Sequence, residues 1–358
     1  EVDSSDLKQL IEKARGFVDS KVHGAAVAPY RALELIEGAF SWDVEQGFAE
    51  EDRALGDLIK SRQCKASIYS FDLVQRRAKR PTGVPEVKPQ KVTKVGFIGA
   101  GLMASQLALL FLRRYEVPVV MKDIKQEFLD KGLDYIQAEL GTLVEKGRLT
   151  EAKARYLLTR VNGTLDWNDF SDCDFVMEAV FEQMEIKQQV FAEAEQAVSK
   201  TCIFATNTSS LSVSEMASKL RHPERVVGFH FFNPVAVLPL VEIIRSQQTN
   251  DITLATVFAA AKQLRKTGIL VKDSAGFLVN RILTKMLADC LDMVDEGADF
   301  QLVDEALLSL GLPMAPFELL GFVGPAVAAH VQETLNRAFG PQSFPINDNL
   351  KKMVEANI

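Results

Sequence analysis

The segment Val95-Gly-Phe-Ile-Gly-Ala-Gly-Leu-Met-Ala104 decides the fold of this chain. Its glycine spacing is G-x-G-x-x-A, and four residues of a short strand precede the glycines while a helical pattern follows them. Gly99 permits a tight turn, Gly101 lets a phosphate approach the backbone, and the small Ala104 allows close packing of helix on strand. The free N–H groups that begin the helix attract an anion. The segment therefore predicts a dinucleotide site formed by Gly99, Gly101, Leu102, Met103 and Ala104.

An acidic residue after the second expected strand, residues 117–122, indicates which dinucleotide is bound. Asp123 lies 24 residues after Gly99, close to the roughly 20 residues that this fold uses. Its carboxylate can accept hydrogen bonds from an adenosine ribose and would repel a 2′-phosphate. Lys122 and Lys125 flank it and soften that preference. The pattern favours NAD over NADP as cofactor, and the alternative is a glycine turn that binds nothing.

Strands and helices are expected to alternate between Lys94 and Ser274. Apolar runs predict strands at 94–98, 117–122, 175–180, 202–205, 225–230, 240–244 and 269–271, and helices at 102–114, 128–146, 185–198 and 212–220. This alternation predicts an α/β fold, a Rossmann-type doubly wound sheet that is largely parallel. Beyond residue 274 only helices are expected, at 278–295, 302–310 and 326–337. An all-α C-terminal domain should therefore follow.

The residues before Lys94 differ in charge from the rest. Residues 1–59 hold 13 acidic and 6 basic residues, with apolar side chains at helical spacing on both sides of Pro29. Residues 60–94 hold 10 basic and 2 acidic residues and three closely spaced prolines. We interpret 1–60 as a helical segment, 61–93 as an extended basic linker, 94–274 as the NAD-binding domain and 275–358 as a helical substrate or dimerisation domain. A docking or anion-binding surface is the alternative for the basic run.

The composition of the 358 residues excludes several protein classes. With 47% hydrophobic and 25% charged residues the chain is globular, and no apolar run reaches the roughly 18 residues of a membrane span. A net charge of −7 argues against nucleic acid as a partner. The four cysteines lie far apart without C-x-x-C spacing, so neither a disulfide framework nor a metal site is expected. These features predict a soluble, intracellular, enzyme-sized protein.

One histidine and one glutamate have sequence contexts that indicate catalytic residues. His230 ends an apolar strand, at the edge where open α/β sheets bind ligands. Glu242 lies within another apolar run, Leu240-Val-Glu-Ile-Ile244, where a carboxylate needs a partner. A carboxylate on one imidazole nitrogen raises the basicity of the other. The pair therefore predicts a catalytic base for removing an alcohol proton during hydride transfer, rather than a structural histidine.

Several motifs in order along the chain resemble the L-3-hydroxyacyl-CoA dehydrogenase family. They are Val180-Phe-Glu182 with Lys187, Thr206-Asn-Thr-Ser-Ser-Leu211, His230-Phe-Phe-Asn-Pro-Val235 and Asp273-Ser-Ala-Gly-Phe-Leu-Val-Asn-Arg281. The resemblance implies that His230 is the general base and Glu242 its orienting acid. It implies that Ser209 and Asn280 bind the substrate's 3-oxygen, and that Asn233 helps to place substrate and nicotinamide. The remaining implied cofactor contacts are Val180, Phe181, Glu182, Lys187 and Asn207.

Plainer roles stay open for some of these residues. Ser209 can cap a helix that begins near Ser212, Asn280 can be an interior polar residue, and Glu182 with Lys187 can form a solvated helix pair. Phe231 and Phe232 are expected to pack. Ala104 and Ala315 stand where the family usually has glycine, and Gly321 stands where it usually has aspartate.

The first eighty residues resemble the end of the enoyl-CoA hydratase half of multifunctional β-oxidation enzymes, through Pro29-Tyr-Arg-Ala-Leu-Glu-Leu-Ile-Glu37 and Phe71-Asp-Leu-Val-Gln-Arg-Arg-Ala-Lys-Arg80. We therefore expect a piece of a longer polypeptide, without hydratase activity of its own. The resemblance implies an acyl-CoA thioester substrate, and a homodimer or a thiolase-containing complex formed through the parent protein. The compartment would be a bacterial cytoplasm or the matrix of a peroxisome or mitochondrion. Two alternatives remain: an idle dinucleotide-binding scaffold and a dehydrogenase of a free hydroxy acid.

Overall fold

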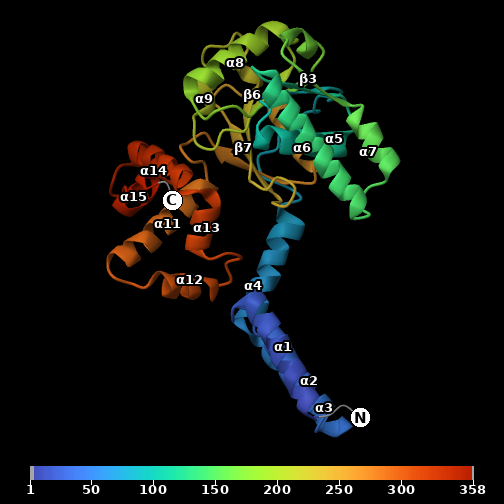
Figure 1. Cartoon of the computed structure of the whole chain (residues 1–358), viewed down its shortest axis with the longest axis vertical. Helices are drawn as coiled ribbons and strands as arrows, with labels where there is room; N and C mark the ends of the chain where they lie inside the picture. The colour runs from blue at the N-terminus through green and yellow to red at the C-terminus, as the bar shows by residue number, and fades with distance from the viewer. Residues whose placement is uncertain (1–3, 357–358) are drawn as a thin grey trace. The chain divides into compact units, whose positions relative to one another are not determined.

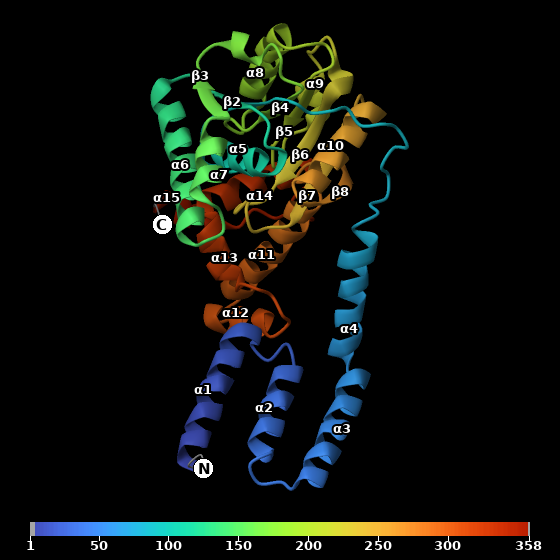
Figure 2. The same ribbon diagram turned by 90° about the vertical axis from the view of Figure 1, so that its right-hand side faces the viewer.

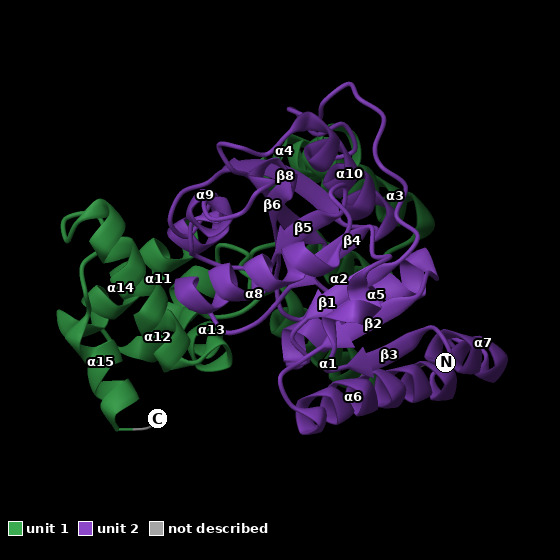
Figure 3. Cartoon of the chain, turned by 90° about the horizontal axis from the view of Figure 1, so that it is seen from above, with its two compact units in different colours: residues 1–77, 282–358 green, residues 78–281 purple. Residues whose placement is uncertain are grey.

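The structure is a computed structural model that describes residues 4–356 and divides into two compact units. One unit comprises residues 78–281, and the other comprises residues 1–77 with 282–358 (Figure 3). Every residue that the sequence predicts for the site, from Gly99 to Asn280, lies in the 78–281 unit. The chemistry can therefore be examined within that unit alone.

An eight-stranded sheet forms the centre of the 78–281 unit, in the order β3-β2-β1-β4-β5-β6-β7-β8. Neighbouring strands are parallel except for β6 and β7, which are antiparallel. From β1 the chain continues to β2 on one side and later to β4 on the other, which makes the doubly wound switch point. The strands are β1 (Val95–Ile98), β2 (Val119–Lys122), β3 (Val161–Thr164), β4 (Phe175–Glu178), β5 (Ile203–Thr206), β6 (Val226–Phe231), β7 (Leu240–Arg245) and β8 (Thr267–Lys272).

Helices cover both faces of the sheet (Figure 1). One apolar core joins the sheet to α5 (Leu102–Tyr115), α6 (Gln126–Glu145), α7 (Glu151–Leu158) and α10 (Asp251–Gln263). A second core on the other face joins it to α8 (Met184–Ala197), α9 (Val213–Ala217) and the short helix Trp167–Phe170. Since both faces are covered, the central strands are largely apolar, and β4 and β6 are buried along their whole length. A charged side chain in these strands therefore requires an explanation.

In the other unit, the regular elements among the described residues are all helices. Its N-terminal part has α1 (Ser4–Val22), α2 (Ala28–Gly38), α3 (Val44–Lys60) and α4 (Arg62–Phe71), followed by one π-helical stretch, Asp72–Arg77. Figure 2 shows α2 beside α1 and α3, as their contacts require. Its C-terminal part has most of α11 (Val279–Asp295), then α12 (Phe300–Leu308), α13 (Pro316–Val323), α14 (Pro325–Phe339) and α15 (Asp348–Glu355). Ala315, one of the departures from the family pattern, is the N-cap residue of α13 and provides no side-chain cap.

The fold class predicted from the sequence is confirmed, and two local expectations are wrong. Residues 62–77 are helical, contrary to the extended conformation expected for the basic segment, and only residues 78–94 of it lie outside helices and strands, in turns, bends and irregular chain. The prolines that indicated an extended chain all lie in that second part. Strand β3 was not expected because Val161-Asn-Gly-Thr164 is an edge strand without an apolar run. Among the described residues, no helix combines the length and apolarity needed to cross a membrane.

Candidate active site

The glycine turn between β1 and α5 has the form that a dinucleotide phosphate requires. Gly99 has a φ of +105°, and a Cβ there would lie 2.7 Å from the carbonyl oxygen of Ala179, so a side chain is excluded on two grounds. Gly101 is the N-cap residue of α5 and makes no side-chain cap. A Cβ on Gly101 would meet nothing within 4 Å. The first turn of α5 therefore faces open space, and Ala104, fully buried, packs the helix onto the sheet.

Asp123 is tied to the same turn. Its Oδ2 accepts a hydrogen bond from the N–H of Ala100 at 2.8 Å, and its Oδ1 accepts one from the N–H of Ile124 at 2.7 Å. The ammonium group of Lys122 lies 4.5 Å from the ring centre of Trp167, and that of Lys125 lies 5.7 Å from Phe128. The two lysines thus contact aromatic faces, which leaves Asp123 as the charge nearest the glycine turn.

His230 and Glu242, which the sequence predicts to be a catalytic pair, are in direct contact. They are directly opposite residues of β6 and β7, and His230 Nδ1 lies 2.8 Å from Glu242 Oε2. The rings of Phe232 and Phe277 lie 4.6 and 5.8 Å from the imidazole, between ring centres. The histidine is 5% exposed and the glutamate is fully buried. The pair is therefore shielded from water except at the imidazole.

The second oxygen of Glu242 determines the protonation pattern. Oε1 accepts hydrogen bonds from the N–H groups of Leu278 and Val279, each at 3.0 Å, where α11 begins. With Oε1 occupied by two N–H donors, Oε2 is the oxygen that accepts from His230 in the tautomer with its proton on Nδ1. Nε2 is then the nitrogen that can accept a proton from a substrate.

The loop after β5 is organised by Glu182. Its Oε1 accepts hydrogen bonds from the hydroxyl of Thr208 at 2.6 Å and from the N–H groups of Ser209 and Ser210 at 2.7 and 3.2 Å. Helix α9 is capped by Ser212, which accepts from the N–H of Glu215. The capping role left open for Ser209 is therefore wrong, and Ser209 is held instead by the partly buried carboxylate of Glu182.

Lys187 connects two carboxylates and is itself buried. Its Nζ lies 2.6 Å from Glu178 Oε1 and 3.2 Å from Glu182 Oε2. Burial lowers the pKa of Lys187, but the two carboxylates outweigh burial and raise that pKa above its ordinary value. Burial raises the pKa of Glu182, yet Lys187, Thr208 and Ser209 together hold it below its usual range. A solvated helix pair, the plainer reading of Glu182 and Lys187, is therefore wrong, because Lys187 is 1% exposed.

Three asparagines connect the elements around the pair. Asn280 Nδ2 donates to the carbonyl oxygen of Ser209 at 3.2 Å, and Asn207 Oδ1 accepts from the N–H of Phe231 at 2.9 Å. Asn233 Oδ1 accepts from Gln106 Nε2 at 3.1 Å. Hydrogen bonds thus run without a break from His230 through Glu242 to the start of α11, and from Asn280 there through Ser209 and Glu182 to Lys187. Val180 and Phe181 lie in the turn after β4, where Phe181 is 77% exposed.

Some residues that hold this arrangement were missed from the sequence. Glu178 is a charged residue within an apolar strand, which is the signal that identified Glu242. Gln106 binds both Asn233 and, through Oε1, the N–H of Val235 at 2.8 Å. Asp273 accepts from Ser212 Oγ and from the N–H groups of Val213 and Ser214, so it fixes the start of α9. Nothing in the local pattern around Gln106 indicated its contact with a loop 127 residues away.

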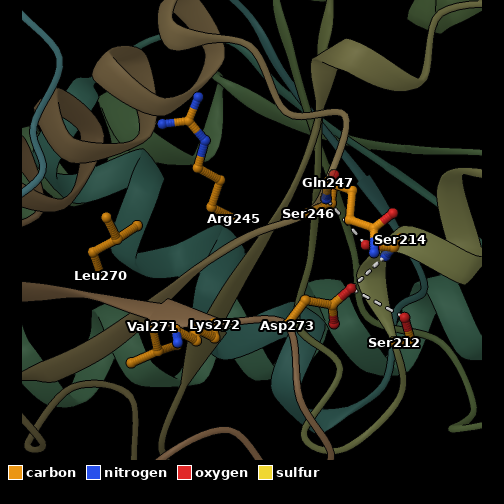
Figure 4. Close-up of a pocket in the computed structure, with 9 residues that line it drawn as sticks. All are labelled: Ser212, Ser214, Arg245, Ser246, Gln247, Leu270, Val271, Lys272 and Asp273. Atoms are coloured by element: carbon orange, nitrogen blue, oxygen red, sulfur yellow. Dashed lines mark hydrogen bonds between the residues drawn. The ribbon is translucent and has the colours of Figure 1, made fainter.

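A pocket of about 540 Å³ lies beside Asp273 (Figure 4). It is lined by Ser212, Ser214, Arg245, Ser246, Gln247, Leu270, Val271, Lys272 and Asp273. None of the residues predicted for catalysis or cofactor binding is among them. Arg245 there is paired with Asp251 at 2.9 Å. The pocket is therefore separate, in its residues, from the His230 site.

Two family models match nearly all of the chain beyond the basic segment. The model of the 3-hydroxyacyl-CoA dehydrogenase NAD binding domain matches residues 94–274, and that of the 3-hydroxyacyl-CoA dehydrogenase C-terminal domain matches residues 276–358. The first covers the glycine turn, Asp123 and the His230–Glu242 pair.

Similar proteins carry related names. A fatty acid oxidation complex subunit alpha from Pseudomonas putida is 35% identical over 328 residues, which are 92% of this chain and 46% of that protein. One from Idiomarina loihiensis is 32% identical over 97% of this chain and 49% of its own length. The chain thus spans about half the length of these relatives.

Solved structures agree with the sequence relatives. The (S)-3-hydroxybutyryl-CoA dehydrogenase PaaH1 from Ralstonia eutropha matches with a TM-score of 0.72 and 35% identity, over 75% of this chain and 95% of that one. FadB2 from M. tuberculosis also has a TM-score of 0.72, with 33% identity and the same coverage. With its buried histidine–glutamate pair and its glycine turn in matching domains, the chain belongs to the 3-hydroxyacyl-CoA dehydrogenase family.

Proposed function

We propose that this chain oxidises L-3-hydroxyacyl-CoA to 3-oxoacyl-CoA with NAD, as a step of fatty acid β-oxidation. The observation that carries the proposal is the buried His230–Glu242 pair on β6 and β7, in the same sheet whose strand β1 leads into the glycine turn. The names of the relatives and of the similar structures support the reaction and the substrate class.

The residues at the glycine turn fit a bound NAD. The space in front of Gly101 and the uncapped start of α5 suit a pyrophosphate, and Asp123 suits the adenosine ribose. When bound, NAD supplies the acceptor of the hydride. Leu102 and Met103 begin the helix beneath the pyrophosphate. Val180, Phe181, Glu182, Lys187 and Asn207 would line the nicotinamide side of the crevice.

The protein's own part of the reaction is to hold the alcohol and remove its proton. Nε2 of His230 takes the proton of the 3-hydroxyl group while Glu242 stabilises the imidazolium that forms. Ser209 Oγ and Asn280 hold the 3-oxygen as it changes from alcohol to ketone. Asn233, fixed by Gln106, places the substrate against the nicotinamide. Phe232 and Phe277 keep water from the imidazole.

The parent protein would be a multifunctional β-oxidation enzyme. This follows from the relatives named as subunits of a fatty acid oxidation complex, of which this chain spans about half. A second copy of the chain or a thiolase-containing complex would be the partner, through that parent.

The direct test is NADH oxidation with acetoacetyl-CoA by the chain and by its His230→Gln variant. We expect turnover by the wild type and a loss of about 10²–10⁴-fold in the variant, the usual contribution of general acid–base catalysis. Turnover of a free 3-oxo acid but not of the thioester would contradict the substrate class. Tight binding of NADH without any turnover would identify an idle scaffold instead.

A further inference from the structure

A buried charge cluster lies beside the proposed nicotinamide site, and its central residue is Glu178. This glutamate ends β4 and is fully buried. Its Oε1 accepts hydrogen bonds from the N–H of Val180 at 2.7 Å and from Lys187 Nζ at 2.6 Å, and its Oε2 accepts one from the hydroxyl of Thr206 at 2.6 Å. Such a set of contacts is costly to bury and must be complete to be tolerated.

The hydrogen bonds show that Glu178 is ionised. Thr206 Oγ1 accepts a hydrogen bond from the N–H of Thr208 at 3.2 Å, so its own proton points to Glu178. Lys187 and the N–H of Val180 are donors as well. Both carboxylate oxygens of Glu178 therefore act only as acceptors, which is the pattern of a carboxylate and not of a carboxylic acid.

The cluster as a whole carries a negative charge. Glu182 also receives donors on both oxygens, from Thr208 and Ser209 on one and from Lys187 on the other. Two carboxylates thus share one ammonium group, and the pKa of Lys187 is raised above its ordinary value by both of them. The sum is one net negative charge on a cluster in which Glu178 and Lys187 are buried and Glu182 is partly exposed.

The sheet puts this charge on the side of the cofactor crevice where the nicotinamide belongs. Glu178 pairs in register with Ile98, the last residue of β1, and with Thr206, the last residue of β5. A dinucleotide crosses the crevice at the switch point with its two nucleotides on either side of it. Asp123 marks the adenosine side after β2, so the other nucleotide lies over β4 and β5, toward His230 on β6.

We propose that Glu178 is a positioning residue whose charge strengthens the binding of the oxidised cofactor relative to that of the reduced one. The inference rests on the proposed function, since it needs NAD in this crevice. The nicotinamide ring of NAD⁺ carries one positive charge and that of NADH carries none, so a fixed negative charge nearby stabilises only the oxidised ring. Glu178 acts through Lys187, because without Glu178 the ammonium would neutralise Glu182 and the cluster would have no net charge. A site with this charge therefore makes the reduction of bound NAD⁺ less favourable than a neutral site would.

The test compares the dissociation constants of NAD⁺ and NADH, measured by calorimetry, in the full chain and in Glu178→Gln. We expect NAD⁺ to bind about tenfold more weakly and NADH to change little, as for a unit charge several ångströms away in a partly screened interior. A purely structural role would weaken both cofactors alike and leave their ratio unchanged. A ratio that stays within about twofold of the wild type overturns the inference.

Two further variants keep the test decisive. Glu195→Gln is the matched control. Glu195 lies on α8 with Lys187, about 12 Å from it along the helix. Like Glu178 it is paired with a buried cation, Arg225, at 3.1 Å. This variant should leave the ratio unchanged. Glu182→Gln removes the other negative charge at a partly exposed position and should shift the ratio in the same direction, even if Glu178→Gln does not fold. Failure of the wild type to bind either cofactor would contradict the proposed function, which is a different outcome from an unchanged ratio.

Discussion

His230 and Glu242 are opposite residues of β6 and β7, and backbone N–H groups at the start of α11 bind the second carboxylate oxygen of Glu242. Nδ1 of the histidine lies 2.8 Å from Oε2, while Oε1 accepts the N–H groups of Leu278 and Val279. The antiparallel pairing of β7 with β6 makes the two residues direct neighbours, although the rest of the sheet is parallel. The orientation of the imidazole ring is therefore set by strand register and by one helix start.

Glu242→Gln should abolish this orientation without changing the size of the side chain. The amide would present an N–H group to Nδ1 and favour the tautomer with its proton on Nε2, which cannot accept the substrate's proton. We expect kcat to fall by about 10²-fold, with the dissociation constant of NADH nearly unchanged. Steady-state kinetics with acetoacetyl-CoA, together with NADH titration, measures both. A kcat close to that of the wild type would show that Glu242 is only structural.

The sequence predicted this pair because a charge within an apolar run is a strong signal, and the same signal at Glu178 was overlooked. The central strands, which are short apolar runs, and the helices that the sequence predicts after Lys94 match the structure to within a few residues, whereas α7, α10, α13 and α15 were not predicted. The antiparallel direction of β7 and the contact of Gln106 with Asn233 depend on how distant segments meet, which no local pattern records. The edge strand β3 lacks a core-facing run, and the helix Arg62–Phe71 was obscured by the prolines that follow it.

Gly99 and Gly101 should respond differently to substitution. Gly101→Val adds a side chain in allowed backbone geometry, with φ of −70°, where nothing lies within 4 Å. We expect an unchanged melting temperature and at least about tenfold weaker NADH binding, because the side chain fills the space of the pyrophosphate.

Gly99→Ala is the counterpart at the same turn. Its φ of +105° and the carbonyl oxygen of Ala179 at 2.7 Å oppose any Cβ. The free energy of unfolding should fall by about 1–3 kcal/mol, as measured by urea denaturation. If Gly101→Val lost as much stability as Gly99→Ala, the open space before α5 would not be a ligand site.

Glu182 should make the stability of the protein depend on pH in the acid range. Its pKa in the folded state lies below its ordinary value, mainly because Lys187 and its hydrogen bonds outweigh burial. Its contribution is therefore fully present above its unfolded pKa of about 4.3 and is lost as the pH falls through the lower folded pKa. Lys187 does not titrate there, since its pKa is raised.

The measurement is the free energy of unfolding between about pH 3 and pH 7, for the wild type and Glu182→Gln. The difference between them should be largest near neutral pH and shrink in acid. Glu127→Gln is the control, because Glu127 pairs with Lys131 on the surface and both side chains are about two-thirds exposed. That variant should show no such trend. A difference between wild type and Glu182→Gln that is constant over the range would contradict the ionised state of Glu182.

Gln106→Leu should disturb the Asn233 loop from a distance. Gln106 lies on α5, in the helix that follows the glycine turn, and its amide binds both Asn233 Oδ1 and the N–H of Val235. Leucine keeps the volume of the side chain but provides neither hydrogen bond. Asn233 would then lose the hydrogen bond that holds its amide, and in the proposed reaction the substrate would lose one of its fixed contacts. We expect KM for acetoacetyl-CoA to rise about five- to tenfold, the loss of roughly one hydrogen bond, with a similar melting temperature. Gln126→Leu is the control. Gln126 lies at the exposed start of α6 and donates its hydrogen bond to Asp130 on the same helix. An unchanged KM in Gln106→Leu would mean that Asn233 keeps its position without Gln106, and that the link between α5 and the loop has no part in substrate binding.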